Sequence, residues 1–100
     1  MPDQNRIILE AIARQLCIAA VYNRTRVMLA PQILYTRHGE LFIDAVTVRK
    51  NGLGVADPKL GTFKCGGLRQ LALTGRGFQR FSGFDANSDK YQETTLLAVT

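Results

Sequence analysis

The chain has 100 residues, of which 46% are hydrophobic and 21% are charged, and its formal net charge is +5 at pH 7. This length and composition predict a single globular domain over residues 1–100 and exclude a disordered chain. No apolar run reaches the ~20 residues of a membrane-spanning helix, and the first residues lack an export signal. We therefore expect a cytoplasmic protein without a membrane partner.

The first predicted element is a helix from about residue 4 to residue 15. Asp3 is placed to cap its N-terminus. Ile8, Ile12 and Leu16 recur every four residues, which is the spacing of one face of a helix. This pattern predicts a helix whose apolar face packs against the rest of the chain.

Three extended segments are predicted after the helix. The run IAAVY at 18–22 is short, continuous and partly β-branched, as in a buried strand, and Asn23-Arg24 then indicates a turn. Strands are also expected at 26–30 and 32–37. Pro31 lies between them and cannot donate to a β-ladder, so it marks an edge, a bulge or a bend.

The strongest predicted strand covers residues 41–48. The turn His38-Gly39 precedes it, and Gly39 is free to take a positive φ. After this strand we expect a long turn region at 50–59, a strand at 60–65 and a break at Gly66-Gly67. A mixed segment at 68–74 then ends in a fifth strand. An irregular stretch follows, and TTLLAVT at 94–100 is expected as an edge strand or a docked tail.

This order of elements predicts a mainly β fold with one N-terminal α-helix. Short strands spaced about ten residues apart are typical of a small, strongly bent antiparallel sheet or of an SH3-like or Sm-like barrel of about five strands. We place the core of the domain at about residues 6–81. Residues 82–100 are expected to form a C-terminal tail or an edge strand.

The residues that usually carry catalysis or bind metals are sparse. His38 is the single histidine and lies in a predicted turn. Cys17 and Cys65 lie in apolar runs without CxxC spacing, so we expect reduced core thiols and no metal site. No glycine-rich nucleotide motif is present. We therefore expect a non-enzymatic protein without a cofactor, although a Cys–His pair stays open.

The basic residues are concentrated in two stretches. Residues 59–80 hold five Lys and Arg and no carboxylate, and three arginines surround the first hairpin, at Arg24, Arg26 and Arg37. This pattern favours anionic partners, either an anionic small molecule or a single-stranded nucleic acid. A mildly basic domain without any polyanion partner is the alternative.

Three sequence blocks in this order, IAAVYNRTRVMLAP, QILYTRHGELFIDAVTV and LGTFKCGGLRQLALTGRGF, resemble the WYL-domain family of bacterial proteins. The resemblance covers about residues 6–81. It implies a small SH3-like or Sm-like barrel that senses an effector in transcriptional regulation, and some members of the wider family contact single-stranded nucleic acid. Since no helix-turn-helix precedes the barrel, we expect a stand-alone sensing module.

The resemblance implies four ligand-binding residues, namely Tyr22, Arg26, Phe42 and Lys64. Two further basic residues, Arg37 and Arg69, are added because of their positive charge. Together these candidates are Tyr22, Arg26, Arg37, Phe42, Lys64 and Arg69. Arg26 lies one residue farther from Pro31 than the family pattern has it. A shift of one residue turns a side chain to the opposite face of a strand, so Arg26 reaches the family's pocket only if a bulge restores the register.

Asp44 is the one carboxylate in the middle of the strongest predicted strand. A buried carboxylate needs a partner, so we predict that Asp44 pairs with a neighbouring arginine or a backbone amide, with direct ligand contact as the alternative. The sequence thus favours a module that binds a nucleotide or a short single-stranded nucleic acid. The alternative is a protein-interaction module that forms a homo-oligomer or a regulatory subunit through TTLLAVT.

Overall fold

The computed structural model of the chain describes residues 4–100. Asp3, predicted as a helix cap, lies outside the described residues. No described helix has the length and apolar character that crossing a bilayer requires. The described elements are, in order, α1 (Gln4–Arg14), β1 (Leu16–Tyr22), β2 (Thr25–Arg37), β3 (Glu40–Lys50), β4 (Leu53–Gly54), β5 (Leu60–Lys64), the 3-10 turn η1 (Cys65–Gly67), β6 (Arg69–Gly77), the 3-10 turn η2 (Asp89–Tyr91) and β7 (Thr94–Ala98).

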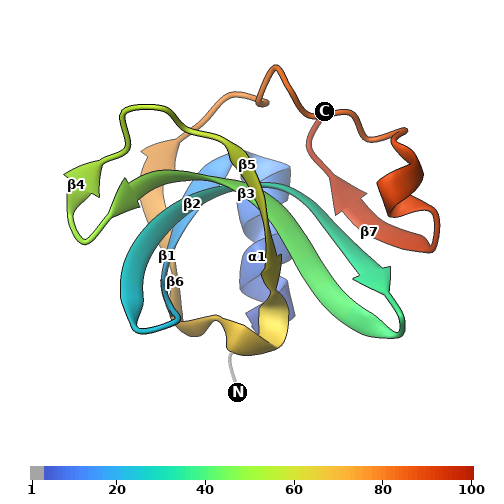
Figure 1. The fold of residues 1–100 in the computed structure, drawn as a ribbon, viewed down its shortest axis with the longest axis horizontal. Helices are drawn as coiled ribbons and strands as arrows, with labels where there is room; N and C mark the ends of the chain where they lie inside the picture. Colours follow the sequence, from blue (N-terminus) through green and yellow to red (C-terminus); the bar gives the residue numbers. More distant parts are fainter. Residues whose placement is uncertain (1–3) are drawn as a thin grey trace.

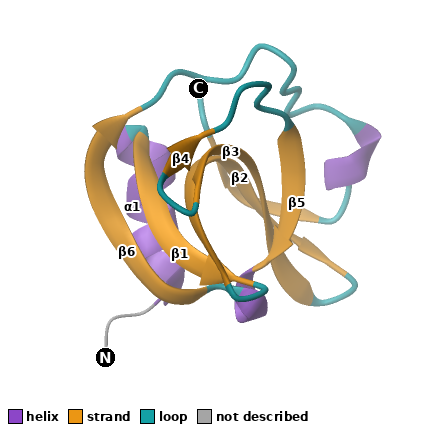
Figure 2. Cartoon of the chain, turned by 60° about the vertical axis from the view of Figure 1, so that its left-hand side comes forward, coloured by secondary structure: helices purple, strands orange, loops and turns teal. Residues whose placement is uncertain are grey.

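The sheet is built around one long hairpin formed by β2 and β3 (Figure 1). β1 pairs with the first half of β2 and carries β6 on its other edge, while β7 pairs with the second half of β2. β4 and β5 pair with different parts of β3. Every pairing is antiparallel, and the sheet curls strongly into a half-barrel (Figure 2). The predicted fold class is confirmed.

Two β-bulges bend the central hairpin. In β2 the register shifts just after Pro31, where Gln32 is the extra residue. In β3 the register shifts again, and Val48 is the extra residue. A bulge bends its strand and increases the local twist, which helps this hairpin take part in both halves of the curled sheet. The bulge is one of the three outcomes expected at Pro31.

The hairpin turns follow the chemistry that the sequence predicts. Asn23 and Arg24 both have positive φ, at 50° and 63°. His38 and Gly39 have φ of 52° and 77°. Two central residues with positive φ match the right-handed twist of the flanking strands, so both turns let a long hairpin form with a two-residue connection. A third such turn, Asn51-Gly52, closes β3 onto the two-residue β4 inside the predicted turn region.

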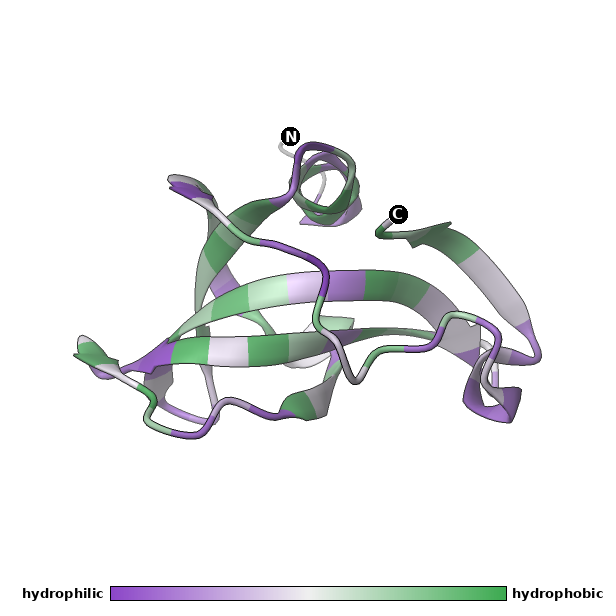
Figure 3. Cartoon of the chain, turned by 90° about the horizontal axis from the view of Figure 1, so that it is seen from above, coloured by the Kyte–Doolittle hydropathy of each residue, from purple (hydrophilic) through white to green (hydrophobic). Residues whose placement is uncertain are grey.

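The main hydrophobic core joins α1 to the sheet. Ile8, Ala11 and Ile12 form the buried face of the helix. Seen from above, α1 lies end-on beside the long strands of the sheet (Figure 3). The C-terminal segment also contributes to this core, through Phe84, Tyr91 and Val99. The segment after residue 81 is therefore part of the folded unit, although the core predicted from the sequence ended at about residue 81.

The run TTLLAVT forms β7, which is an edge strand. β7 pairs with β2, and Val99 extends the contact because its N–H donates to the Gln32 carbonyl at 2.7 Å. Within residues 4–100 no strand pairs with the other edge of β7. Leu96 lies in this strand and is 43% exposed. One backbone edge of β7 and an apolar side chain are therefore accessible.

Candidate ligand-binding pocket

A pocket lies inside the curl of the sheet, where β5 approaches β1. β5 is hydrogen-bonded to β3 and reaches β1 through side chains. Tyr22 of β1 meets Phe63 of β5 edge-to-face, with the ring centroids 5.0 Å apart. Gly67 makes room for this contact, because a Cβ at that position would lie 3.0 Å from the Tyr22 ring. The aromatic pair therefore forms one wall of the pocket.

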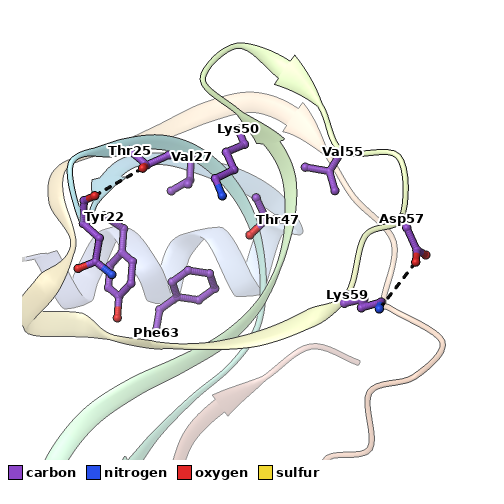
Figure 4. Close-up of a pocket in the computed structure, with 10 residues that line it drawn as sticks. Tyr22, Thr25, Val27, Thr47, Lys50, Val55, Asp57, Lys59 and Phe63 are labelled. Atoms are coloured by element: carbon purple, nitrogen blue, oxygen red, sulfur yellow. Dashed lines mark hydrogen bonds and ion pairs between the residues drawn. The ribbon is translucent and has the colours of Figure 1, made fainter.

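Two lysines give the pocket a positive rim. Lys50, the last residue of β3, points toward the space beside the Phe63 ring, and Lys59 lies across the opening (Figure 4). Lys59 lies 3.8 Å from the exposed carboxylate of Asp57, whereas Lys50 has no ion-pair partner among residues 4–100. The pocket has a volume of about 440 Å³ and is lined by Tyr22, Asn23, Thr25, Val27, Thr47, Lys50, Val55, Asp57, Lys59 and Phe63.

This arrangement suits a flat ligand that carries a negative charge. Aromatic rings stack on bases and other flat rings, and an ammonium group binds phosphate as a point charge. Thr25 and Thr47 add hydroxyl groups that can donate or accept hydrogen bonds. His38, Cys17 and Cys65 lie outside this pocket. The pocket therefore offers a ligand an aromatic surface, ammonium groups and hydroxyl groups.

The structure does not bring the six predicted ligand-binding residues together. Tyr22 is the one that lines the pocket. In the β1–β2 ladder Tyr22 lies opposite Thr25 and Val21 lies opposite Arg26, with no bulge between the two pairs. Neighbouring residues of a strand point to opposite faces, so Arg26 lies on the outer face of the sheet. Arg69 pairs with Val21 and shares that outer face.

The other three predicted residues lie at separate places. Phe42 is half-buried and stacks on Tyr35, with ring centroids 6.1 Å apart. The Lys64 ammonium lies 3.0 Å from the Glu40 carboxylate at the surface. Arg37 is exposed at the end of β2. These residues share no pocket with Tyr22.

Sequence reasoning missed both lysines of the pocket. Lys50 and Lys59 are the first and last residues of the stretch 50–59. No regular element was predicted there, so the sequence did not indicate to which face of the sheet their side chains point. A usable signal was nevertheless present for Lys50. The two bulges of the β2–β3 hairpin cancel, so counting residue pairs outward from its turn places Lys50 opposite Val27, as observed. Val27 and Tyr22 lie on the same, inner face of the curled sheet, and both line the pocket. The position opposite Val27 therefore placed Lys50 at the pocket.

Asp44 is fully buried, and its partners differ from those predicted. The hydroxyl groups of Tyr35, Tyr91 and Thr62 donate to its carboxylate at 2.7, 2.6 and 2.9 Å. The Lys90 ammonium lies 2.8 Å from the same carboxylate. The prediction of an arginine or a backbone amide was wrong, because the basic partner is a lysine that η2 brings to β3 from a distant part of the chain.

These contacts keep Asp44 ionised. Burial raises the pKa of this carboxyl, but the hydrogen bonds from Lys90, Tyr91, Tyr35 and Thr62 outweigh burial, and the pKa lies below its ordinary value of 3.8. Burial and the adjacent carboxylate raise the pKa of both tyrosines well above the ordinary range, so both hydroxyls stay protonated as donors. Asp44 therefore links β3 to the C-terminal segment.

Comparisons with protein-family models, with curated proteins and with solved structures find no match to this chain. Within residues 4–100, no three His, Cys, Asp or Glu side chains lie close enough together to hold a metal ion. The pocket between Tyr22 and Phe63 is thus identified by its geometry and its charge, and the resemblance to the WYL-domain family stays a prediction.

Proposed function

We propose that this chain is a non-enzymatic, WYL-like sensing module that binds an anionic ligand in the pocket between Tyr22 and Phe63. The ligand is a nucleotide or the end of a short single-stranded nucleic acid, and binding is linked to transcriptional regulation. One observation carries the proposal: an aromatic pair and two lysines, Lys50 and Lys59, line the same pocket.

The magnitudes support a ligand of this size and charge. A pocket of about 440 Å³ falls in the range of small-molecule sites, ~300–1,000 Å³. Stacking of one base on an aromatic ring is worth about 1–3 kcal/mol. The net charge of +5 adds a long-range attraction for anions that weakens as salt is added. Stacking and charge together are sufficient for a reversible sensor.

Fluorescence anisotropy with a labelled mononucleotide and a labelled oligothymidylate, at low and at moderate salt, tests this function. We expect saturable binding that weakens steeply with salt. The double variant Lys50→Gln/Lys59→Gln removes both pocket cations and should weaken binding about tenfold or more. The matched control Arg6→Gln/Arg37→Gln removes two exposed charges elsewhere and should change affinity less than twofold. No binding at low salt, or equal losses in both double variants, contradicts the proposal.

A second candidate function is a protein-interaction module that pairs through β7. The free edge of β7 and the exposed Leu96 favour it, because an uncharged edge strand is a template for pairing with another chain. Sedimentation equilibrium should then show a concentration-dependent dimer, and Leu96→Lys should abolish it by placing a charge on the edge. A wild-type chain that stays monomeric at every concentration tested rules this function out.

A further inference from the structure

A second pocket lies on the outer face of the sheet, opposite the one between Tyr22 and Phe63. Cys17 points to this outer side, because its neighbour Ile18 belongs to the main core. The pocket has a volume of about 320 Å³ and is lined by Cys17, Ala30, Gln32, Val46, Val48, Pro58, Arg76, Gly77, Phe78, Gln79 and Phe81. Its wall thus combines four strands (β1, β2, β3 and β6), the loop at Pro58 and the segment after β6.

The walls of this outer pocket are largely apolar. Cys17, Ala30 and Val46 form a buried cluster separate from the main core. Half-buried side chains packed against that cluster include Met28, Val48, Leu60, Phe78 and Phe81. Protein interiors are normally close-packed, so an apolar cluster that encloses an open volume gains stability when an apolar group fills it.

Hydrogen bonds hold the pocket open in a defined shape. The Phe81 N–H donates to the Gln32 Oε1 at 2.9 Å, and the Gln32 amide donates to the Ala30 carbonyl at 3.0 Å. Phe78 is fixed in the same way, because its N–H donates to the Gln15 carbonyl at 3.0 Å. A preorganised pocket spends little binding energy on ordering its own walls.

Arg76 is the one charged side chain among the residues that line this pocket. Burial raises the pKa of the Cys17 thiol, and the positive charge of Arg76 opposes that rise. Arg76 forms no ion pair with any residue in the range 4–100. An apolar ligand with one negative group therefore complements this pocket.

We propose that the outer pocket binds a small apolar carboxylate, with its hydrocarbon part against Val46, Val48 and Phe81 and its carboxylate on Arg76. A guanidinium pairs with a planar carboxylate through two parallel hydrogen bonds. A phosphate monoester carries up to two negative charges and would meet only this one cation. The proposal does not depend on the ligand of the pocket between Tyr22 and Phe63, since the two pockets lie on opposite faces of the sheet.

Titration of the full chain with 1-naphthoate, followed by amide chemical shifts in NMR spectra and by calorimetry, tests the proposal. We expect saturable binding with the largest shifts at Cys17, Ala30 and Val46. The neutral analogue 1-naphthalenemethanol should bind at least tenfold more weakly, because it carries no negative charge to pair with Arg76. No saturation at millimolar naphthoate, or shifts confined to Tyr22 and its surroundings, overturns the proposal.

Two variants and a matched control sharpen the test. Arg76→Gln should weaken naphthoate binding about tenfold, and Val48→Phe should abolish it by filling the pocket. Arg69→Gln removes an equal charge from the same strand outside the pocket and should leave affinity unchanged. Should Val48→Phe fail to fold, Arg76→Gln decides alone, because Arg76 is exposed. Equal affinity in wild type and Arg76→Gln overturns the assignment.

Discussion

At the scale of single residues, a small set of contacts stabilises the buried carboxylate of Asp44. Its carboxylate accepts hydrogen bonds from two buried tyrosines and lies 2.8 Å from Lys90. Lys90 is 38% exposed, so water weakens its part of the interaction, while the bonds to the tyrosines are shielded. Asp44 is thus stabilised mainly by short hydrogen bonds in a dry environment.

We predict that Asp44→Asn lowers the free energy of unfolding by about 2–4 kcal/mol, because one buried acceptor is replaced by a donor and the ion pair is lost. Urea denaturation monitored by circular dichroism measures this change. Glu40→Gln is the matched control: it removes a carboxylate from the exposed pair with Lys64 and should change stability by less than ~1 kcal/mol. Equal effects of the two substitutions contradict the role assigned to Asp44.

The pH dependence of stability provides a second readout for Asp44. Its folded pKa lies below the ordinary value, so the unfolded state binds the proton more readily. The stabilisation is therefore fully present above the unfolded pKa of about 4 and is lost as the pH falls through the folded pKa. Denaturation curves between pH 6 and pH 2 should show a shallower loss for Asp44→Asn than for the wild type. Parallel curves contradict this prediction.

What could be predicted at this scale was the need for a partner, and what could not was its identity. A carboxylate in an apolar strand implies a compensating group from general physical chemistry. Tyr35 lies on the adjacent strand, but Tyr91 and Lys90 come from η2, and no local pattern says where a segment after a long irregular stretch will dock. Long-range contacts of this kind depend on the whole chain path.

At the scale of elements, hairpin turns are where local sequence acts most directly. Arg24 sits at φ 63°, a conformation unfavourable for a side chain with a Cβ, while Gly39 sits at φ 77° without that cost. A Cβ added at Gly39 would meet no atom within 4 Å, so the effect of substitution there is a backbone effect alone. The two positions therefore form a matched pair.

We predict that Arg24→Gly raises the free energy of unfolding by about 0.5 kcal/mol and that Gly39→Ala lowers it by about 1 kcal/mol. Thermal and urea denaturation of both variants measure these changes. Opposite signs are the essential outcome, since the same conformational preference acts in both turns. Changes of the same sign would show that contacts of the turn residues outweigh their backbone conformation.

The positions of the strands were predictable, and their faces only partly so. Apolar runs and turn chemistry located β1, β2 and β3, although the sequence analysis divided β2 at Pro31 into two strands. The face of Arg26 stayed open from sequence, because it depended on a bulge; the β1–β2 ladder has none beside Arg26, which therefore lies on the outer face. The outer pocket was not predictable, because the segment containing Phe78 and Phe81 has no periodicity that fixes its path over the sheet. A site formed by an irregular segment can be located only from the three-dimensional structure.

At the scale of the whole molecule, charge is separated along the chain. The stretches 11–39, 45–56 and 58–84 contain no Asp or Glu, and they hold every Lys and Arg except Arg6 and Lys90. These stretches form most of the curled sheet and both pockets. Basic side chains on the same sheet repel one another at low salt, which lowers the stability of the compact state.

We therefore predict that raising NaCl from 0.02 to 0.5 M increases the urea midpoint without changing the m value, because screening weakens this repulsion. The row Arg69–Val21–Arg26 across three strands allows a local version of the test. Arg69→Glu should exceed Arg69→Gln in stability by about 0.5 kcal/mol at low salt, and the difference should vanish at 0.5 M. A midpoint that falls with salt would show that attractive pairs, among them Lys90 with Asp44, outweigh repulsion across the sheet, and the charge separation would then matter for ligands alone.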